Sequence, residues 1–325
     1  MKKFLLALIL LSTQIASAHT GKLNILVSIN PIYSLVKNVV QDSDISDLLV
    51  NPNISPHHYQ LKPSDIRKIQ QADLIFIVDK NFETFLANYI SKNNLKAKII
   101  ELSHSSGIKT LPARNIKVLH THSSHDHDHH DCHHHHHDHD HDDHNHEHHH
   151  RSIDLHLWTS VGNAEAMVKQ IEKNVTELNP EHAHIYKKNT KNTLKKLRKL
   201  DKEIKIILDR KVQNSPFIVF HDAYQYFEKR YNLKNAGSVA GSNFIYGPKT
   251  LQNLRKSIEQ NNVQCIFAEP QFSNEVINKV AKSTNTNAGY LDIEGGSFGK
   301  NINPQDLYFF MMKQNALNIR DCVKK

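Results

Sequence analysis

Short apolar runs alternate along the chain with segments whose apolar positions recur at helical spacing. The apolar runs are the predicted strands: 23–29, a run ending at Val50, 74–78, 97–102, 217–220, 263–268 and 289–293. The helical segments between and after them begin at Pro31 and cover 63–71, 82–90, 163–178, 224–231, 250–261, 275–283 and the stretch from Pro304. Strands that are apolar on both faces and alternate with helices are typical of parallel sheets covered by helices. The pattern therefore predicts an α/β fold.

One helical segment is much longer than the others. Residues 182–210 contain no Gly or Pro, and at 1.5 Å per residue they predict a helix of roughly 40 Å. The strand–helix alternation resumes after it. We therefore expect two Rossmann-like lobes, 19–179 and 212–325, joined by one rigid connecting helix at 180–211. A ligand is expected in the cleft between the lobes, at the carboxyl ends of the strands.

The amino terminus has the pattern of an export signal. Lys2 and Lys3 precede an apolar run at 4–11, and small residues follow at 16–18. The run is too short for a membrane anchor, which needs about 20 apolar residues. We interpret residues 1–18 as a signal peptide that is cleaved after Ala18, which places the protein in the periplasm. No Cys stands beside the cleavage position to carry a lipid, so we expect no lipid anchor.

A low-complexity tract at 120–150 lowers the apolar content of the whole chain to 38%. Eighteen of its 31 residues are His and eight are Asp or Glu. Such a composition cannot bury a core and predicts a disordered loop inserted in the first lobe. We expect it to offer many weak zinc sites that raise the local zinc concentration. The accessory ligands are His120, His122, His125, His127, His129, His130, His133, His134, His135, His136, His137, His139, His141, His144, His146, His148, His149 and His150.

The net charge of +8 does not point to nucleic acid. The lysines are spread along helical segments without interleaved aromatic residues, as on solvated helix faces.

Three of the eight histidines outside the tract lie at element boundaries. His57 precedes the helix at 63–71, His156 precedes the helix at 163–178, and His221 directly follows the strand at 217–220. A single histidine at a strand end is more often structural. Three of them in a chain that also has a His tract favour a metal site. Imidazole nitrogens with at most one carboxylate, here Asp292 near the end of another predicted strand, suit tetrahedral Zn²⁺ better than manganese.

The motifs around these residues, at 55–66, 154–158, 220–227 and 291–292, resemble those of the substrate-binding proteins of zinc-uptake ABC transporters. The resemblance covers nearly the whole chain after the signal peptide. It implies two α/β lobes with one metal in the cleft between them. It also implies that His57 and His156 come from the first lobe and His221 from the second.

The resemblance bears on metal choice, the fourth ligand and the cysteines. Similar manganese proteins commonly have Glu where this chain has His221, which favours zinc. Pro56 stands where some zinc proteins have a Glu ligand. The fourth position is therefore left to Asp292 or a water molecule. Cys265 and Cys322 fall where similar zinc proteins form a disulfide, whereas the residues alone leave a bridge and two buried thiols equally open.

We therefore expect a monomeric protein that is not an enzyme. It would capture Zn²⁺ in the periplasm and deliver it to a membrane-embedded ABC permease. One alternative is a zinc hydrolase with the same three histidines and an open fourth position for water. The chain lacks a His-Glu-x-x-His motif, and the nearest general base in sequence is Glu294. Another alternative is an adhesin with the same metal chemistry, since some similar proteins were first described as adhesins.

Overall fold

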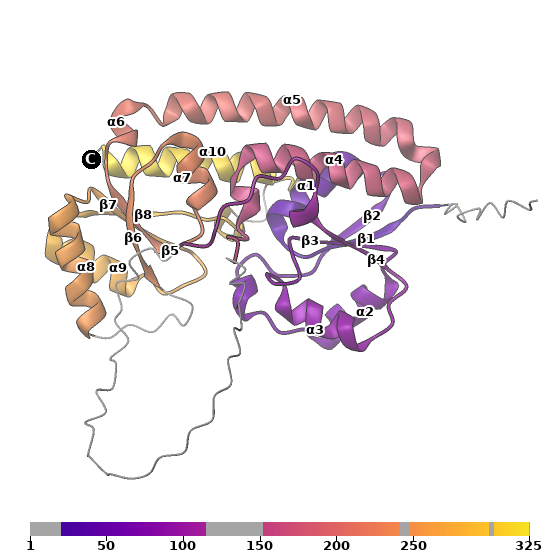
Figure 1. Ribbon diagram of the computed structural model, residues 1–325, viewed down its shortest axis with the longest axis horizontal. Coiled ribbons are helices and arrows are strands. Elements are labelled where there is room, and N and C mark those ends of the chain that lie inside the picture. Colours follow the sequence, from indigo (N-terminus) through magenta and orange to yellow (C-terminus); the bar gives the residue numbers. More distant parts are fainter. Residues whose placement is uncertain (1–20, 115–151, 241–247, 299–301, 325) are drawn as a thin grey trace, which may run out of the picture.

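The computed structural model describes residues 21–114, 152–240, 248–298 and 302–324. The predicted signal peptide at 1–18 and the predicted tract at 120–150 lie outside these residues. Figure 1 shows two lobes side by side beneath a long helix. Each lobe is built on a four-stranded sheet.

The first sheet has the strand order β2-β1-β3-β4, and all neighbouring strands run parallel. Every residue of β3 is buried, as expected for a strand covered on both faces. The strands are β1 (Asn24–Val27), β2 (Ile45–Leu48), β3 (Leu74–Ile77) and β4 (Lys98–Glu101). The connecting helices are α1 (Asn30–Val40), α2 (Pro63–Gln71) and α3 (Thr84–Lys92).

The second sheet repeats this topology, with the order β6-β5-β7-β8 and parallel pairing throughout. The winding direction reverses between β1 and β3 in the first lobe and between β5 and β7 in the second, which is where open α/β sheets bind ligands. The strands are β5 (Phe217–His221), β6 (Asn235–Ala240), β7 (Cys265–Ala268) and β8 (Asn287–Tyr290). The helices between them are α7 (Gln225–Tyr231), α8 (Pro248–Asn261) and α9 (Glu275–Thr284).

The predicted fold of two parallel α/β lobes is confirmed, with two differences in the second lobe. The pattern missed β6, because Asn235, Gly237 and Ser238 break the apolar run that marks a buried strand. It also placed the last strand at 289–293, whereas β8 ends at Tyr290. The apolar residues Leu291 and Ile293 are buried in the loop that follows.

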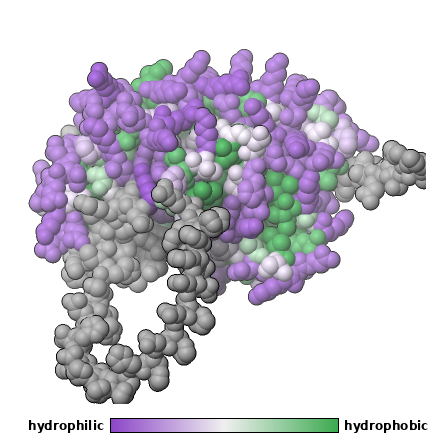
Figure 2. Space-filling view, in the orientation of Figure 1, coloured by the Kyte–Doolittle hydropathy of each residue, from purple (hydrophilic) through white to green (hydrophobic). Residues whose placement is uncertain are grey.

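The connecting helix is α5 (Ala183–Ile207), preceded by a 3₁₀ turn at Pro180–His182 and followed by the short helix α6 (Arg210–Gln213). Its 25 residues correspond to about 37 Å. Its buried face packs on α4 (Val161–Leu178), which precedes it, and on α1. Its lysines are exposed, and the upper face of the molecule over α5 is accordingly hydrophilic (Figure 2).

The two lobes share one hydrophobic core. The last helix, α10 (Pro304–Val323), follows β8 in sequence but packs on α1 of the first lobe as well as on α5. Hydrogen bonds tie α10 to α1, with the backbone N–H of Tyr308 donating to Ser34 Oγ at 3.0 Å. The largest buried cluster contains Phe76 of the first sheet and Phe267 of the second. Since packed cores resist continuous deformation, this shared core opposes a wide hinge motion.

Candidate metal centre

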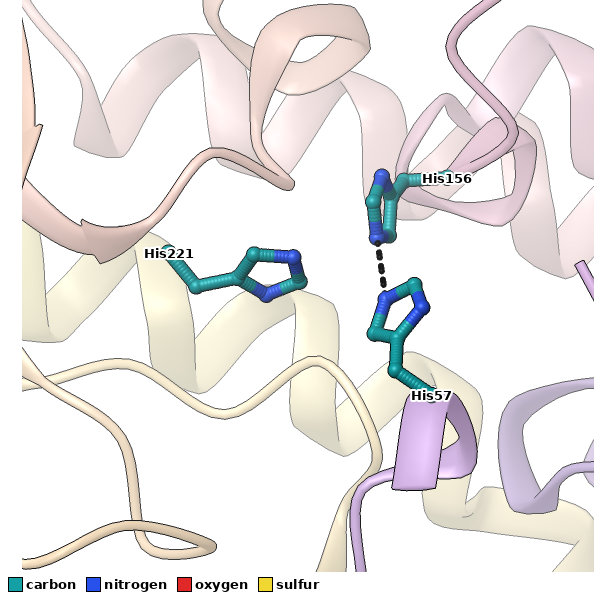
Figure 3. Close-up of side chains that lie close together, drawn as sticks. All are labelled: His57, His156 and His221. Carbon is teal, nitrogen blue, oxygen red and sulfur yellow. Dashed lines mark hydrogen bonds between the residues drawn. The ribbon is translucent and has the colours of Figure 1, made fainter. Parts of the chain in front are cut away.

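Three histidine rings converge where the two lobes meet (Figure 3). His57 lies in the 3₁₀ turn Pro56–His58 after β2, His156 directly precedes the 3₁₀ turn Leu157–Thr159, and His221 is the last residue of β5. One nitrogen from each ring lies within 4.8 Å of the other two. The Nε2 atoms of His57 and His156 are 3.4 Å apart. Two nitrogens that each lie about 2.05 Å from a tetrahedral zinc ion are separated by about 3.4 Å.

The turn that carries His57 is fixed by the start of α2. The Asp65 carboxylate accepts hydrogen bonds from the Lys62 backbone N–H at 2.9 Å and from the Tyr59 hydroxyl at 2.8 Å. Tyr59 is buried, so this pair holds the loop from β2 to α2 in place. Residue His57 is exposed as a whole, yet its ring lies against Phe82 at a centroid distance of 5.0 Å.

The pKa of His57 falls from 6.5 to about 2. Burial of the ring is the main cause, and the electrostatic influence of the neighbouring His156, His221 and His58 rings lowers the pKa further. His57 is therefore a neutral imidazole at neutral pH, with a lone pair available for a metal.

A carboxylate orients the ring of His156. Asp154 Oδ1 lies 2.8 Å from Nδ1 of His156 and also accepts the backbone N–H of His156 at 3.0 Å. Burial alone would raise the pKa of Asp154, but the hydrogen bond and charge of His156 hold it below its ordinary value. A carboxylate on one ring nitrogen fixes the tautomer and leaves the other nitrogen for a metal. His156 thus presents Nε2 to the centre.

Glu269 has the corresponding position beside His221. Because β5 and β7 are neighbours, their carboxyl ends place His221 Nδ1 3.7 Å from Glu269 Oε2. The Tyr224 hydroxyl donates to the other oxygen of Glu269 at 3.1 Å. Burial opposes charge on His221, but the Glu269 carboxylate outweighs it, so the pKa of His221 is raised. Sequence reasoning missed Glu269, although its place directly after a buried strand was the available signal.

The structure does not bring Asp292 together with the three histidines. Its buried carboxylate accepts backbone N–H groups from Glu294, Gly295 and Ser297, and the side chains of Ser297 and Gln271 also donate to it. These bonds hold the loop after β8. The acidic residues that line the cavity beside the histidines are Glu269 and Glu294 instead. Burial raises the pKa of Glu294 well above its ordinary value, and the nearby carboxylates of Asp292, Glu269 and Glu83 add to the effect.

The cavity among the histidines is small, at about 10 Å³. That is room for about one water-sized sphere. It therefore suits a single ion.

A second group of possible ligands, Asp79, Glu101 and His104, lies at the carboxyl ends of β3 and β4. Its two carboxylates have structural partners. Asp79 accepts the Ser103 hydroxyl at 2.6 Å, and Glu101 accepts the Lys80 backbone N–H at 3.0 Å. These bonds tie the two strand ends together, and they give Asp79 and Glu101 a structural role.

The disulfide between Cys265 and Cys322 is present and links β7 to α10. Among the described residues, no helix has the length and apolar character needed to cross a membrane.

Two parallel α/β lobes on a shared core, with three histidines converging between them, define a two-lobed protein with a candidate metal centre. The chain belongs to the family described as the periplasmic component A of the zinc-uptake complex, whose family model matches residues 25–322. Members of this family are solute-binding proteins and not enzymes.

Comparisons with individual proteins agree with this assignment. The chain is 37% identical over 310 residues to a high-affinity zinc uptake system protein of Brucella suis, covering 93% of this chain and 92% of that protein. It is 33% identical over 347 residues to the Haemophilus influenzae protein of the same description, with both chains fully covered. A crystal structure of a zinc-uptake component A superposes with a TM-score of 0.73 at 22% identity, covering 93% of this chain and 99% of the other.

Proposed function

We propose that this protein captures Zn²⁺ in the periplasm with His57, His156 and His221 and delivers it to a membrane-embedded ABC permease. The observation that carries the proposal is the convergence of three imidazole nitrogens on a cavity for one ion. Zinc is the cargo and undergoes no chemistry. The zinc uptake named in the descriptions of the Brucella suis and Haemophilus influenzae relatives supports the same conclusion.

The chemistry of the donor set supports zinc as the ion. Imidazole nitrogens match the ligand preference of Zn²⁺, whereas manganese prefers more oxygen donors. The Asp154 carboxylate lies 2.8 Å from Nδ1 of His156, and the Glu269 carboxylate lies 3.7 Å from Nδ1 of His221. Such carboxylates orient the ring and raise its basicity, which strengthens metal binding.

We also propose that the tract at 120–150 collects zinc for this centre. The described residues on either side of it support the idea. Pro112 and Ile153 form an antiparallel bridge that brings the two flanks together. Arg114 forms an ion pair at 2.8 Å with Asp222, the neighbour of His221, and Asp154 is two residues from His156. A tract anchored there would hold zinc at high local concentration beside the centre.

Release would involve a small change in shape. The shared core and the long helix α5 oppose wide opening of the lobes, so zinc would leave through local movement of the loops that carry the ligands.

We further propose export with cleavage after Ala18, a monomer without a lipid anchor, and lobes divided at the connecting helix. A hydrolase is disfavoured because members of the matching family are solute-binding proteins.

Growth in zinc-depleted medium tests the proposed function. A strain that lacks this protein should stop growing when a chelator removes zinc and recover when zinc is added. The wild-type gene should restore growth, whereas His57→Ala and His221→Ala should not. His184→Ala, on the exposed face of α5, is the control and should restore growth fully. Growth of the deletion strain at wild-type rate in depleted medium would contradict a role in uptake.

A further inference from the structure

The long helix α5 carries nearly all of the positive charge excess of the chain. The helix contains nine Lys or Arg residues and two Asp or Glu residues, which is a net charge of +7. The whole chain has a net charge of +8, so all the other residues together contribute only +1. Because the excess is confined to one element, it is a property of the surface over α5 and not of the protein as a whole.

The cations on α5 form one continuous stripe along its outer face. Residues three or four apart are neighbours on the surface of a helix. Six cations follow one another at alternating spacings of three and four residues, over about 25 Å of helix. All six are exposed. The members of the stripe are Lys188, Lys191, Lys195, Arg198, Lys202 and Lys205.

Only two members of the stripe have an acidic partner. Arg198 lies 3.4 Å from the Glu165 carboxylate of α4, and Lys205 lies 2.9 Å from Asp201, one turn earlier. Among the residues that the structure describes, none forms an ion pair with the four remaining lysines of the stripe. Like charges at these spacings destabilise a helix. The stripe therefore opposes the stability of α5, and such conflicts are expected where a surface serves binding.

The position and shape of the stripe suit a flat partner. Helix α5 runs along one edge of the molecule, with α2, α3, α8 and α9 on the opposite side (Figure 1). A straight stripe at such an edge can touch a plane along its whole length. Ile206, which is 79% exposed, lies one turn after Lys202 and adds an apolar side chain at the end of the stripe. Cations beside an exposed apolar side chain are typical of surfaces that bind anionic lipid.

We propose that the stripe on α5 is a docking surface for a bilayer rich in anionic phospholipid, whose phosphate groups lie against the unpaired lysines. The inference rests on the proposed function for its setting, because a receptor that delivers zinc to a membrane-embedded permease works beside such a bilayer. Each lysine near an anionic membrane surface strengthens binding about fivefold. The attraction is screened beyond about 10 Å at 0.1 M salt. The contact is therefore reversible, and it concentrates the receptor at the membrane without fixing it there.

Co-sedimentation with lipid vesicles tests the proposal on the mature protein. A chelator is present throughout, so that zinc on the histidines cannot bridge to phosphate. One set of vesicles contains phosphatidylethanolamine and phosphatidylglycerol, and the uncharged set contains phosphatidylcholine alone. The wild type should bind the phosphatidylglycerol vesicles at low salt, leave them at about 0.5 M salt, and not bind phosphatidylcholine.

Two variants with the same change in net charge separate the stripe from positive charge in general. The stripe variant should bind the anionic vesicles more weakly than the wild type by roughly tenfold or more. It combines Lys188→Gln, Lys191→Gln, Lys195→Gln and Lys202→Gln. The control variant changes four exposed lysines of α3, α8 and α9 and should bind as the wild type does. It combines Lys92→Gln, Lys256→Gln, Lys279→Gln and Lys282→Gln. Thermal unfolding of the stripe variant should occur at the wild-type temperature or above it, because repulsion within α5 is relieved.

Three results would overturn the proposal. The first is a wild type that does not bind the anionic vesicles. The second is equal weakening in both variants, which would show that only net charge matters. The third is self-association without vesicle binding that the stripe variant abolishes, which would assign this face to a second copy of the chain.

Zinc titration of the stripe variant separates this proposal from the proposed function. The variant should bind zinc as the wild type does, because its four substitutions lie outside the metal centre. Absent vesicle binding with intact zinc binding would refute only the membrane surface. A wild type that binds no zinc would refute the proposed function, whatever its behaviour on vesicles.

Discussion

Removing the disulfide between Cys265 and Cys322 should destabilise the protein strongly without affecting its metal centre. The bond joins the first residue of β7 to the last turn of α10, and both cysteines are buried. The replacement Cys265→Ala with Cys322→Ala removes the bond and leaves no reactive thiol at either position.

The magnitude follows from the length of chain that the bond closes. The cysteines are 57 residues apart in sequence. Loop-closure entropy for a loop of this length corresponds to about 4 kcal/mol at 25 °C. Since the free energy of unfolding of a domain is typically about 5–15 kcal/mol, the loss is a large share of the total. Zinc binding should survive, because Cys265 begins β7 whereas Glu269 follows its carboxyl end, about 13 Å away.

Guanidinium unfolding, followed by far-ultraviolet circular dichroism, provides the assay. The wild type should lose about 4 kcal/mol of unfolding free energy when a reductant is added. The double alanine variant should start at the lower value and be indifferent to reductant. A difference below about 1 kcal/mol between oxidised wild type and variant would refute the loop-closure reasoning.

Three further substitutions test the contact between the two lobes, the orientation of a histidine ligand and the protonation of a buried carboxylic acid. Gly296→Ala should weaken zinc binding in a calorimetric titration. The reason is that a Cβ at Gly296 would meet the carbonyl oxygen of Pro52 in the other lobe and force the two loops apart. Unchanged affinity would show that the loops adjust freely. Asp154→Asn should weaken zinc binding roughly 10–100-fold in the same assay, because His156 loses the carboxylate that fixes its tautomer, and an affinity equal to that of the wild type would count against that role. Burial raises the pKa of Glu83 from 4.5 to about 7, so the folded state binds this proton more tightly than the unfolded state does. Wild type should therefore lose stability relative to Glu83→Gln as pH rises from about 4.5 to about 7, by a difference on the order of 3 kcal/mol; parallel unfolding free energies across that range would contradict the shift.

Much of the fold could be predicted because its elements have strong local patterns. Buried strands such as β3 are continuous apolar runs, and α2 begins with Pro63 as expected. The strand β6 could not be found in this way, because it is defined by pairing with β5 rather than by its own composition. The sharing of α10 between the lobes depends on contacts with α1, which is more than 260 residues away in sequence, and no local pattern reports it.

The candidate site was predictable to a different degree for its nitrogen and oxygen donors. The three histidines stand at strand ends or helix starts, and parallel strands direct their carboxyl ends to a common edge. The direction in which a carboxylate points depends on which groups donate hydrogen bonds to it. Asp292 follows β8 closely in sequence, as a ligand at the carboxyl end of that strand would. However, both of its oxygens accept hydrogen bonds from backbone N–H groups of its own loop. Glu269 was missed because the pairing of β7 with β5 is not visible in the sequence.

Competitive zinc titration of three forms of the mature protein tests the central claim most directly. The forms are the wild type, a variant without residues 120–150, and His221→Ala. We predict that the wild type binds one zinc ion tightly and further ions weakly. The deletion variant should keep the tight site and lose the weak ones, and His221→Ala should lose the tight site and keep the weak ones. Loss of the tight site in the deletion variant, together with its survival in His221→Ala, would contradict the account.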